Sequence, residues 1–219
     1  MIRKSLMLGL AALLMSQPAE AATMFNLTLV DPLAGLGSVS FGTVSVTENA
    51  NGSLTFLETL TPGFKIHDGT SNHNAFSFSI AGDPTVTVSS LTAGFAAIST
   101  SSGSNVSAPP FGSFFTAIDC TTSCGPGYNG GYAGTLSFTV SAAKTLTLQS
   151  LGFNTYNGHN VYFTTDVVNA LGYTGNVGAA GVVAAVPEPA TWALMLVGFG
   201  GVGYSMRRRK QGHMTAVTA

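Results

Sequence analysis

Residues 76–80 read Phe-Ser-Phe-Ser-Ile, and this alternation of apolar and hydroxyl side chains decides the fold. Successive side chains of a β-strand point to opposite faces of a sheet, so a period of two predicts a strand with one buried and one solvated face. The same pattern occurs at residues 25–29, Phe-Asn-Leu-Thr-Leu, and at residues 136–140, Leu-Ser-Phe-Thr-Val. Half-buried strands are therefore expected along most of the chain.

Further short apolar and β-branched stretches predict additional strands. They lie at residues 39–46, 54–60, 86–88, 95–98, 114–118, 145–151 and 161–167. A phase slip at Gly42 indicates a bulge in the first of them. Turn signals separate the strands: Asn51-Gly52, Gly82-Asp83-Pro84, Asn129-Gly130-Gly131 and Asn157-Gly158. Many short strands without long crossovers predict an all-β fold, an antiparallel β-sandwich that is jelly-roll-like.

The charge of the chain is concentrated at its ends. Of eight Lys and Arg residues, six belong to the two terminal segments, which leaves Lys65 and Lys144 between them. The same central part carries seven acidic residues, so its net charge is 2 − 7 = −5. Binding a phosphate backbone needs a basic surface. The composition therefore argues against nucleic acid as a partner.

Residues 1–21 have the features of a secretory signal peptide. Arg3 and Lys4 precede an apolar core at residues 6–15, and Ala19-Glu20-Ala21 is a small-residue cleavage site. We therefore expect cleavage between Ala21 and Ala22. The sandwich is predicted to span residues 22–171, with a Ser-rich surface loop at residues 99–110. Residues 172–185, rich in Gly and Ala, are expected to form a linker.

The C-terminal segment, residues 186–210, combines three features. Pro187 and Pro189 flank Glu188 and disfavour a helix there. The uncharged residues 190–206 would form a helix of about 26 Å, the short limit for crossing a membrane. A cationic cluster then stops translocation on the cytoplasmic side. Its members are Arg207, Arg208, Arg209 and Lys210, and residues 211–219 would follow as a short cytoplasmic tail.

This order of Pro187-Glu188-Pro189, Trp192, apolar span and arginine cluster resembles the PEP-CTERM sorting signal of Gram-negative bacteria. The resemblance implies recognition by an exosortase, a membrane cysteine transpeptidase, and export alongside exopolysaccharide. It also implies that these four residues are read by the sorting enzyme. Similar tails usually end soon after the arginines, whereas this chain continues to Ala219. An ordinary single-pass anchor is the alternative interpretation, and the body matches no single family.

Two cysteines, Cys120 and Cys124, enclose three residues. In an exported chain this spacing predicts a disulfide. Closing so small a loop stabilises by about 2 kcal/mol, so the bond would stiffen a loop rather than hold the fold. A zinc site would need further ligands, and a redox dithiol normally has a two-residue spacing.

The densest polar group contains His67, Asp68, His73 and Asn74. Two histidines on one loop could ligate a metal. The favoured interpretation is a solvated turn in which Asp68-Gly69 makes a tight bend, and no metal site is predicted.

No catalytic motif emerges from the remaining residues. His159 and Asp166 are separated by an odd interval and should face opposite sides of a sheet. The chain lacks the nucleophile elbow, the calcium loop and the phosphate-binding glycine loop. Nothing selects two of the seven carboxylates as a glycosidase pair. The protein is therefore predicted not to be an enzyme and to need no cofactor.

Two binding functions stay open as alternatives. Tyr128, Tyr132, Tyr156 and Tyr162 could stack on sugar rings, although the same residues could pack against strands and loops. The only tryptophan lies in the tail. The pairs Thr85-x-Thr87 and Thr145-x-Thr147 are similar to the Thr-x-Thr rows of ice-binding surfaces, but threonine is common on strands in any case.

The sequence as a whole favours an exported, structural or adhesive protein of an extracellular polysaccharide matrix. An exosortase is the expected partner, the C-terminal helix the expected contact with the inner membrane before processing, and polysaccharide a further partner. The destination would be the cell surface or matrix of a Gram-negative bacterium, as in a biofilm or floc. A carbohydrate-binding module is the alternative, followed by a secreted hydrolase or an ice-binding protein.

Overall fold

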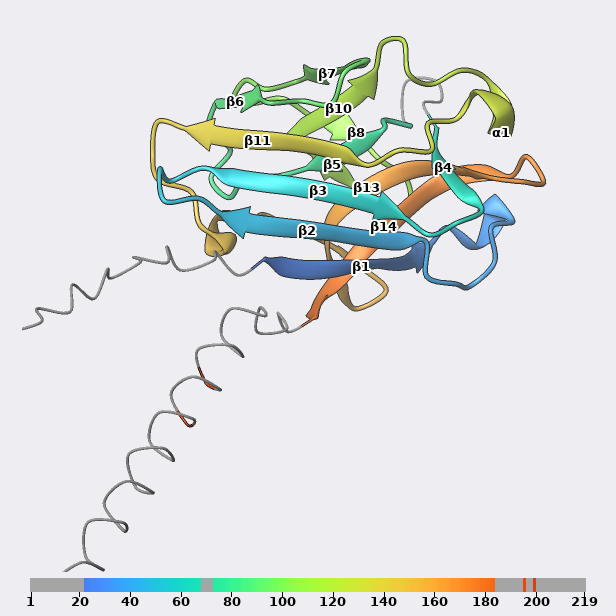
Figure 1. Cartoon of the computed structure of the whole chain (residues 1–219), viewed down its shortest axis with the longest axis horizontal. Helices are drawn as coiled ribbons and strands as arrows, with labels where there is room; N and C mark the ends of the chain where they lie inside the picture. Colours follow the sequence, from blue (N-terminus) through green and yellow to red (C-terminus); the bar gives the residue numbers. More distant parts are fainter. Residues whose placement is uncertain (1–21, 68–72, 184–194, 196–198, 200–219) are drawn as a thin grey trace, which may run out of the picture. The chain divides into compact units, whose positions relative to one another are not determined.

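The structure, a computed structural model, describes residues 22–67 and 73–183, together with Met195 and Phe199. These residues form antiparallel β-structure with almost no helix (Figure 1). The strands are β1 (Thr23–Val30), β2 (Gly42–Glu48), β3 (Leu54–Leu60), β4 (Phe64–Ile66), β5 (Phe76–Phe78), β6 (Val86–Ser89), β7 (Phe95–Ile98), β8 (Val106–Ser107), β9 (Ser113–Phe114), β10 (Thr116–Cys120), β11 (Leu136–Ala142), β12 (Asn154–Tyr156), β13 (His159–Asn169) and β14 (Thr174–Val183). Three helical turns accompany them: η1 (Pro32–Ala34), α1 (Gly127–Gly130) and η2 (Leu148–Ser150).

Twelve strands belong to one sheet, which folds over so that its two halves face each other. The order is β6-β11-β3-β2-β1-β14-β13-β5-β10-β7, with β4 and β12 also paired to β13. Val86 N donates to Thr100 O at 2.9 Å and links the two ends of this order, so the sheet nearly closes into a barrel. The all-β antiparallel prediction is confirmed, but the two halves are continuous through the β1–β14 pair instead of being two separate sheets.

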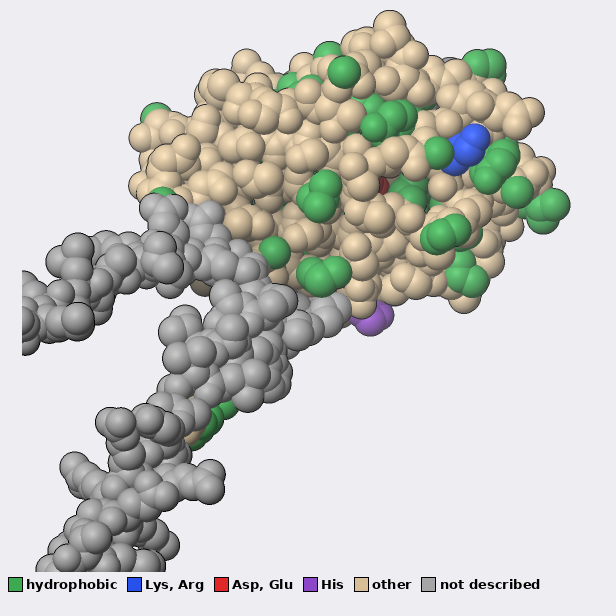
Figure 2. Space-filling view, in the orientation of Figure 1, with side chains coloured by type: hydrophobic (Ala, Val, Ile, Leu, Met, Phe, Trp, Pro, Cys, Tyr) green, Lys and Arg blue, Asp and Glu red, His purple; other side chains and the backbone are tan. Residues whose placement is uncertain are grey.

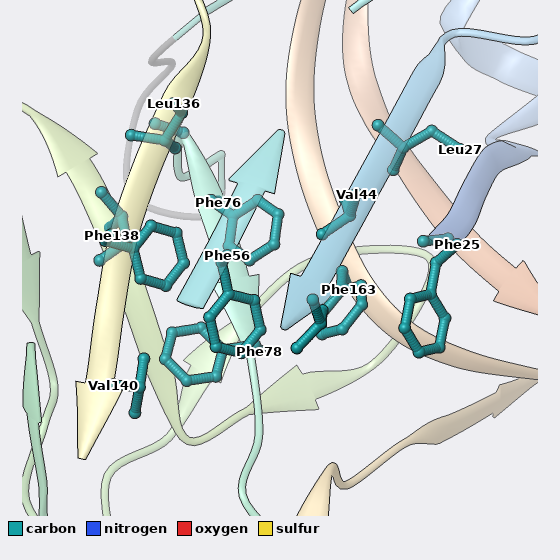
Figure 3. Close-up of a cluster of buried hydrophobic side chains, with 14 of the residues drawn as sticks. Phe25, Leu27, Val44, Phe56, Phe76, Phe78, Leu136, Phe138, Val140 and Phe163 are labelled. Carbon is teal, nitrogen blue, oxygen red and sulfur yellow. The ribbon is translucent and has the colours of Figure 1, made fainter. Parts of the chain in front are cut away.

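Phenylalanines fill the space between the two halves of the sheet (Figure 3). Phe56 of β3 stacks on Phe138 of the neighbouring β11 at 4.9 Å between ring centroids. Across the core it meets Phe78 of β5 at 5.3 Å and Phe163 of β13 at 5.7 Å. Phe76 completes the group and, like the other four, is fully buried. The alternation in residues 76–80 therefore directs β5 into the core as the sequence indicates, although Ser77 is buried as well.

Most predicted strands are present, and two predictions were wrong in detail. At Gly42, β2 simply begins: a Cβ there would lie 2.3 Å from Thr59 O, so glycine permits the close approach of β3. Register shifts occur instead where β14 pairs with β1 and with β13. Residues 145–151 do not form a strand but contain η2, in which Thr147 and Ser150 make a capping box.

The largest correction concerns residues 172–185, which the sequence suggested as a linker. Residues 174–183 form β14, which is paired with β1 on one side and β13 on the other. Its small residues misled the prediction because Gly and Ala have low β-propensity. They suit a crowded position: a Cβ at Gly178 would lie 3.1 Å from the Phe111 ring and from Val161. The folded body therefore extends beyond residue 171.

The chain divides into a unit of residues 21–186 and a second unit made of residues 1–20 and 187–219. The signal peptide, the sorting residues, the predicted membrane helix at residues 190–206, the arginine cluster and the tail at 211–219 lie outside the described residues, apart from Met195 and Phe199. Within the described parts of the chain, no helix has the length and apolar character needed to span a membrane.

Candidate functional site

A buried carboxylate between two histidines is the most concentrated polar group of the body. Asp166 on β13 is fully buried. Its Oδ2 lies 2.7 Å from His67 Nδ1, and its Oδ1 lies 3.2 Å from His73 Nδ1. Each histidine ring therefore contacts a different oxygen of one carboxylate. The sequence placed the histidines on one loop but did not identify Asp166 as their partner.

Strand pairing explains why these three residues meet. β4 pairs with residues 167–169 of β13, whereas β5 pairs with Phe163 and Thr164. His67 directly follows β4 and His73 precedes β5. Both histidines therefore lie beside Asp166, which is located between the segments of β13 that pair with β4 and with β5. Backbone bonds fix the arrangement, since His67 N donates to Asp166 O at 2.9 Å and Asp166 N donates to Asn74 O at 3.1 Å.

The shared carboxylate determines what the histidines can do chemically. The hydrogen bond to Asp166 raises the pKa of His73, although burial partly opposes this change. Nδ1 of each ring is engaged, which leaves Nε2 as the remaining nitrogen. Within residues 22–67 and 73–183 no group of three or more His, Cys, Asp or Glu side chains is arranged to hold a metal ion. The sequence predicted a solvated turn here, whose bend at Asp68-Gly69 lies outside the described residues. Of the two histidine side chains beside it, that of His67 is 14% exposed and that of His73 is 38% exposed.

A second buried acid lies on the opposite face of β13. Glu58 of β3 points into the core, and its Oε1 accepts a hydrogen bond of 2.5 Å from Thr165 Oγ1. No hydrogen-bond partner faces its Oε2. Burial raises the pKa of Glu58 to about 8, and the Thr165 bond opposes this only in part. Glu58 is therefore predominantly protonated at neutral pH.

The two buried acids do not form a catalytic pair. Thr165 and Asp166 are consecutive on one strand, so their side chains point to opposite faces of the sheet. Glu58 contacts the first and the histidines contact the second. His159 is exposed at the start of β13, away from Asp166. Glu58 and Asp166 therefore do not face a common space, which is the arrangement that a pair of carboxyl groups acting on one bond requires.

The four tyrosines considered for sugar stacking each have an intramolecular partner. Three of them pack on phenylalanines. The distances between ring centroids are 5.0 Å for Tyr132 and Phe95, 4.9 Å for Tyr156 and Phe111, and 5.2 Å for Tyr162 and Phe25. The fourth, Tyr128, has Lys65 Nζ 4.3 Å above its ring. All four are partly buried. These side chains therefore take part in packing, which is one of the two roles that the sequence left open for them.

Cys120 and Cys124 form a disulfide, as the spacing predicted. The bond lies at the end of β10, next to the turn that carries Gly94. Thr121 and Thr122 within the closed loop donate their backbone N–H groups to Gly94 O. The disulfide therefore belongs to a stiffened surface loop and has no nucleophilic role in this form.

An exported all-β protein with a C-terminal sorting segment is the class that the fold and the tail define together. The family model of the PEP-CTERM protein-sorting motif matches residues 185–210. The chain carries this motif, which implies export and sorting by an exosortase at the membrane. The match contains Pro187, Glu188, Pro189, Trp192 and the arginine cluster. No curated protein and no solved structure matches the chain.

Proposed function

We propose that this protein is a non-catalytic structural or adhesive component of an extracellular matrix, delivered to the surface of a Gram-negative cell by exosortase sorting. The observation that carries the proposal is the PEP-CTERM motif at residues 185–210. It begins directly after β14, which ends at Val183. A folded β-body would thus be presented outside the cell by a tail built for membrane processing.

The architecture of the body supports a structural role. Its sheet nearly closes on itself, and its two end strands, β6 and β7, have only four residues each. Short and protected edges limit uncontrolled strand addition, which matters for a protein that accumulates at high local concentration. The buried acids are divided between two faces of β13, which disfavours a hydrolase. The aromatic pairings above disfavour recognition of sugars by ring stacking.

The test is the intact mass of the protein recovered from cell envelope and culture medium of cells that contain an exosortase. We expect a chain that begins at Ala22 and ends near residues 187–189, with or without an added group. The double variant Pro187→Ala/Pro189→Ala should retain its tail. Pro62→Ala/Pro84→Ala provides the matched control, because it changes two prolines of the body and should be processed normally.

A tail that stays intact to Ala219 in the wild type, with no effect of either double variant, would contradict sorting. Hydrolysis of glycan or ester substrates by the purified protein would contradict the non-catalytic part. That activity would have to persist in preparations purified by two independent routes, which excludes a contaminating hydrolase.

A further inference from the structure

One face of the sheet is covered by hydroxyl side chains. The strands β6, β11, β3 and β2 lie side by side in the sheet (Figure 1), and their outward positions alternate with the buried core residues. We call these outward side chains the hydroxyl face; they are Thr43, Ser45 and Thr47 of β2, Thr55 and Thr59 of β3, Ser137, Thr139 and Ser141 of β11, and Thr87 and Ser89 of β6.

Strand register orders these hydroxyl groups into rows. Ser89, Thr139, Thr55 and Thr47 are paired in succession across four strands. Within this row Thr55 Oγ1 lies 3.1 Å from Thr139 Oγ1. On one side of this row Ser45 and Ser137 flank Leu57, and beyond them Thr43 pairs with Thr59; on the other side Ser141 pairs with Thr87. Neighbouring side chains within a row are about 4.8 Å apart, which is the distance between strands. Successive rows are about 6.8 Å apart, which is two residues along a strand. The sequence showed only isolated Thr-x-Thr pairs because the rows run between strands.

The hydroxyl face carries no charge. Two acids occur on its strands, but Glu58 points into the core, and Glu48 Oε1 accepts a hydrogen bond from Leu148 N at 2.6 Å at the end of β2. Leu57, 42% exposed, is the one large apolar residue among the outward positions of these four strands. Figure 2 shows this side of the body largely as backbone and uncharged polar side chains, with scattered hydrophobic patches and a cationic side chain toward the right of the view.

We propose that the hydroxyl face binds a neutral polysaccharide chain. Serine and threonine hydroxyls both donate and accept hydrogen bonds, as sugar hydroxyls do, so an ordered array of them complements an extended glycan. An acidic polysaccharide is disfavoured because the face offers no cation and the body is negatively charged. A second copy of the protein is disfavoured because stable protein interfaces have an apolar core, and Leu57 alone does not supply one.

The physical character of the face sets the expected mode of binding. Each hydroxyl contact exchanges a water hydrogen bond for a sugar hydrogen bond, so each adds little and several must act together. Binding should therefore be weak per site, reinforced on a long chain with many equivalent positions, and nearly independent of salt. The proposal rests on the proposed function only in that export would give the face access to polysaccharide.

The experiment measures retention of the full-length chain, solubilised in mild detergent, on microcrystalline cellulose as the neutral probe and on alginate beads as the acidic probe. The face variant is Thr43→Val/Thr59→Val/Thr87→Val, which removes three hydroxyl groups while keeping β-branched side chains. The control variant makes the same change at exposed threonines elsewhere: Thr121→Val/Thr155→Val/Thr174→Val. We expect the face variant to bind cellulose about ten-fold or more weakly than the wild type and the control variant to change less than about two-fold.

Equal retention of wild type and face variant, or retention of both on alginate alone, would overturn the proposal. Inhibition of ice recrystallisation without cellulose binding would overturn it too, because the rows would then order water rather than sugar. If the triple variant has a lowered melting temperature, Thr59→Val and Thr87→Val measured singly replace it, each with an expected loss of about two-fold or more. The binding experiment uses the full-length chain with its tail uncleaved, so its result does not depend on whether the tail is processed in cells. Either proposal can therefore fail while the other stands.

Discussion

Replacing Glu58 by glutamine should remove a large pH dependence from the stability of the body. The pKa of Glu58 is raised from 4.5 to about 8 by burial, so the folded state holds a proton that the unfolded state releases above pH 4.5. The stabilisation is complete below pH 4.5 and is lost as the pH rises toward 8. A difference of about 3.5 pKa units corresponds to about 5 kcal/mol in total, or about 1.4 kcal/mol for each pH unit in this interval.

Urea unfolding at several pH values between 5 and 8 provides the measurement. The free energy of unfolding of the wild type should fall by about 2–3 kcal/mol between pH 5 and 7. His73 adds a smaller dependence of the same sign, because its pKa is also raised in the folded state. Glu58→Gln keeps His73 unchanged, so the difference between the two slopes isolates Glu58. Glu58→Leu should flatten the profile in the same way. Parallel profiles for wild type and Glu58→Gln would refute the burial argument.

Three further perturbations test the core, the histidine cluster and the disulfide. Asp166→Ala should lower the free energy of unfolding by about 2–4 kcal/mol, because two partly buried imidazoles lose their acceptor, and NMR titration should show the pKa of His73 falling. Phe56→Ala should cost about 3–5 kcal/mol, whereas Leu57→Ala should change stability by less than about 0.5 kcal/mol; similar costs would mean that the assigned strand faces are wrong. Replacing Cys120 and Cys124 by serine should cost about 2 kcal/mol in a thermal melt, and complete unfolding would contradict a purely local role.

Period-two alternation predicted the faces of most strands because it reflects local geometry. The same alternation marks a buried acid. Glu58 is in phase with Leu54 and Phe56, so the pattern already places this acid on the buried face of β3. A carboxylate in phase with core residues is a candidate for a raised pKa, and identifying one needs only the strand and its register.

The remaining features depend on contacts between distant parts of the chain, which periodicity does not contain. The hydrogen bonds of Asp166 join residues 93 and 99 positions apart. The rows of the hydroxyl face follow from the registers of β2 with β3, β3 with β11 and β11 with β6. β14 forms in spite of weak intrinsic propensity because both of its neighbours bond to it. In each case the strand order had to be known before the site could be recognised.

The position of β14 also connects the fold to the sorting of the protein. Only four positions separate Val183 from Pro187, so the sorting residues lie at most about 14 Å along the chain from the end of the sheet. A protein attached through this end would carry any pulling force into β14. That strand is hydrogen-bonded to β1 and β13 along much of its length, and bonds perpendicular to the strands share such a load rather than breaking one at a time. For the matrix role proposed above, attachment next to a doubly paired strand would keep the body folded under such a load.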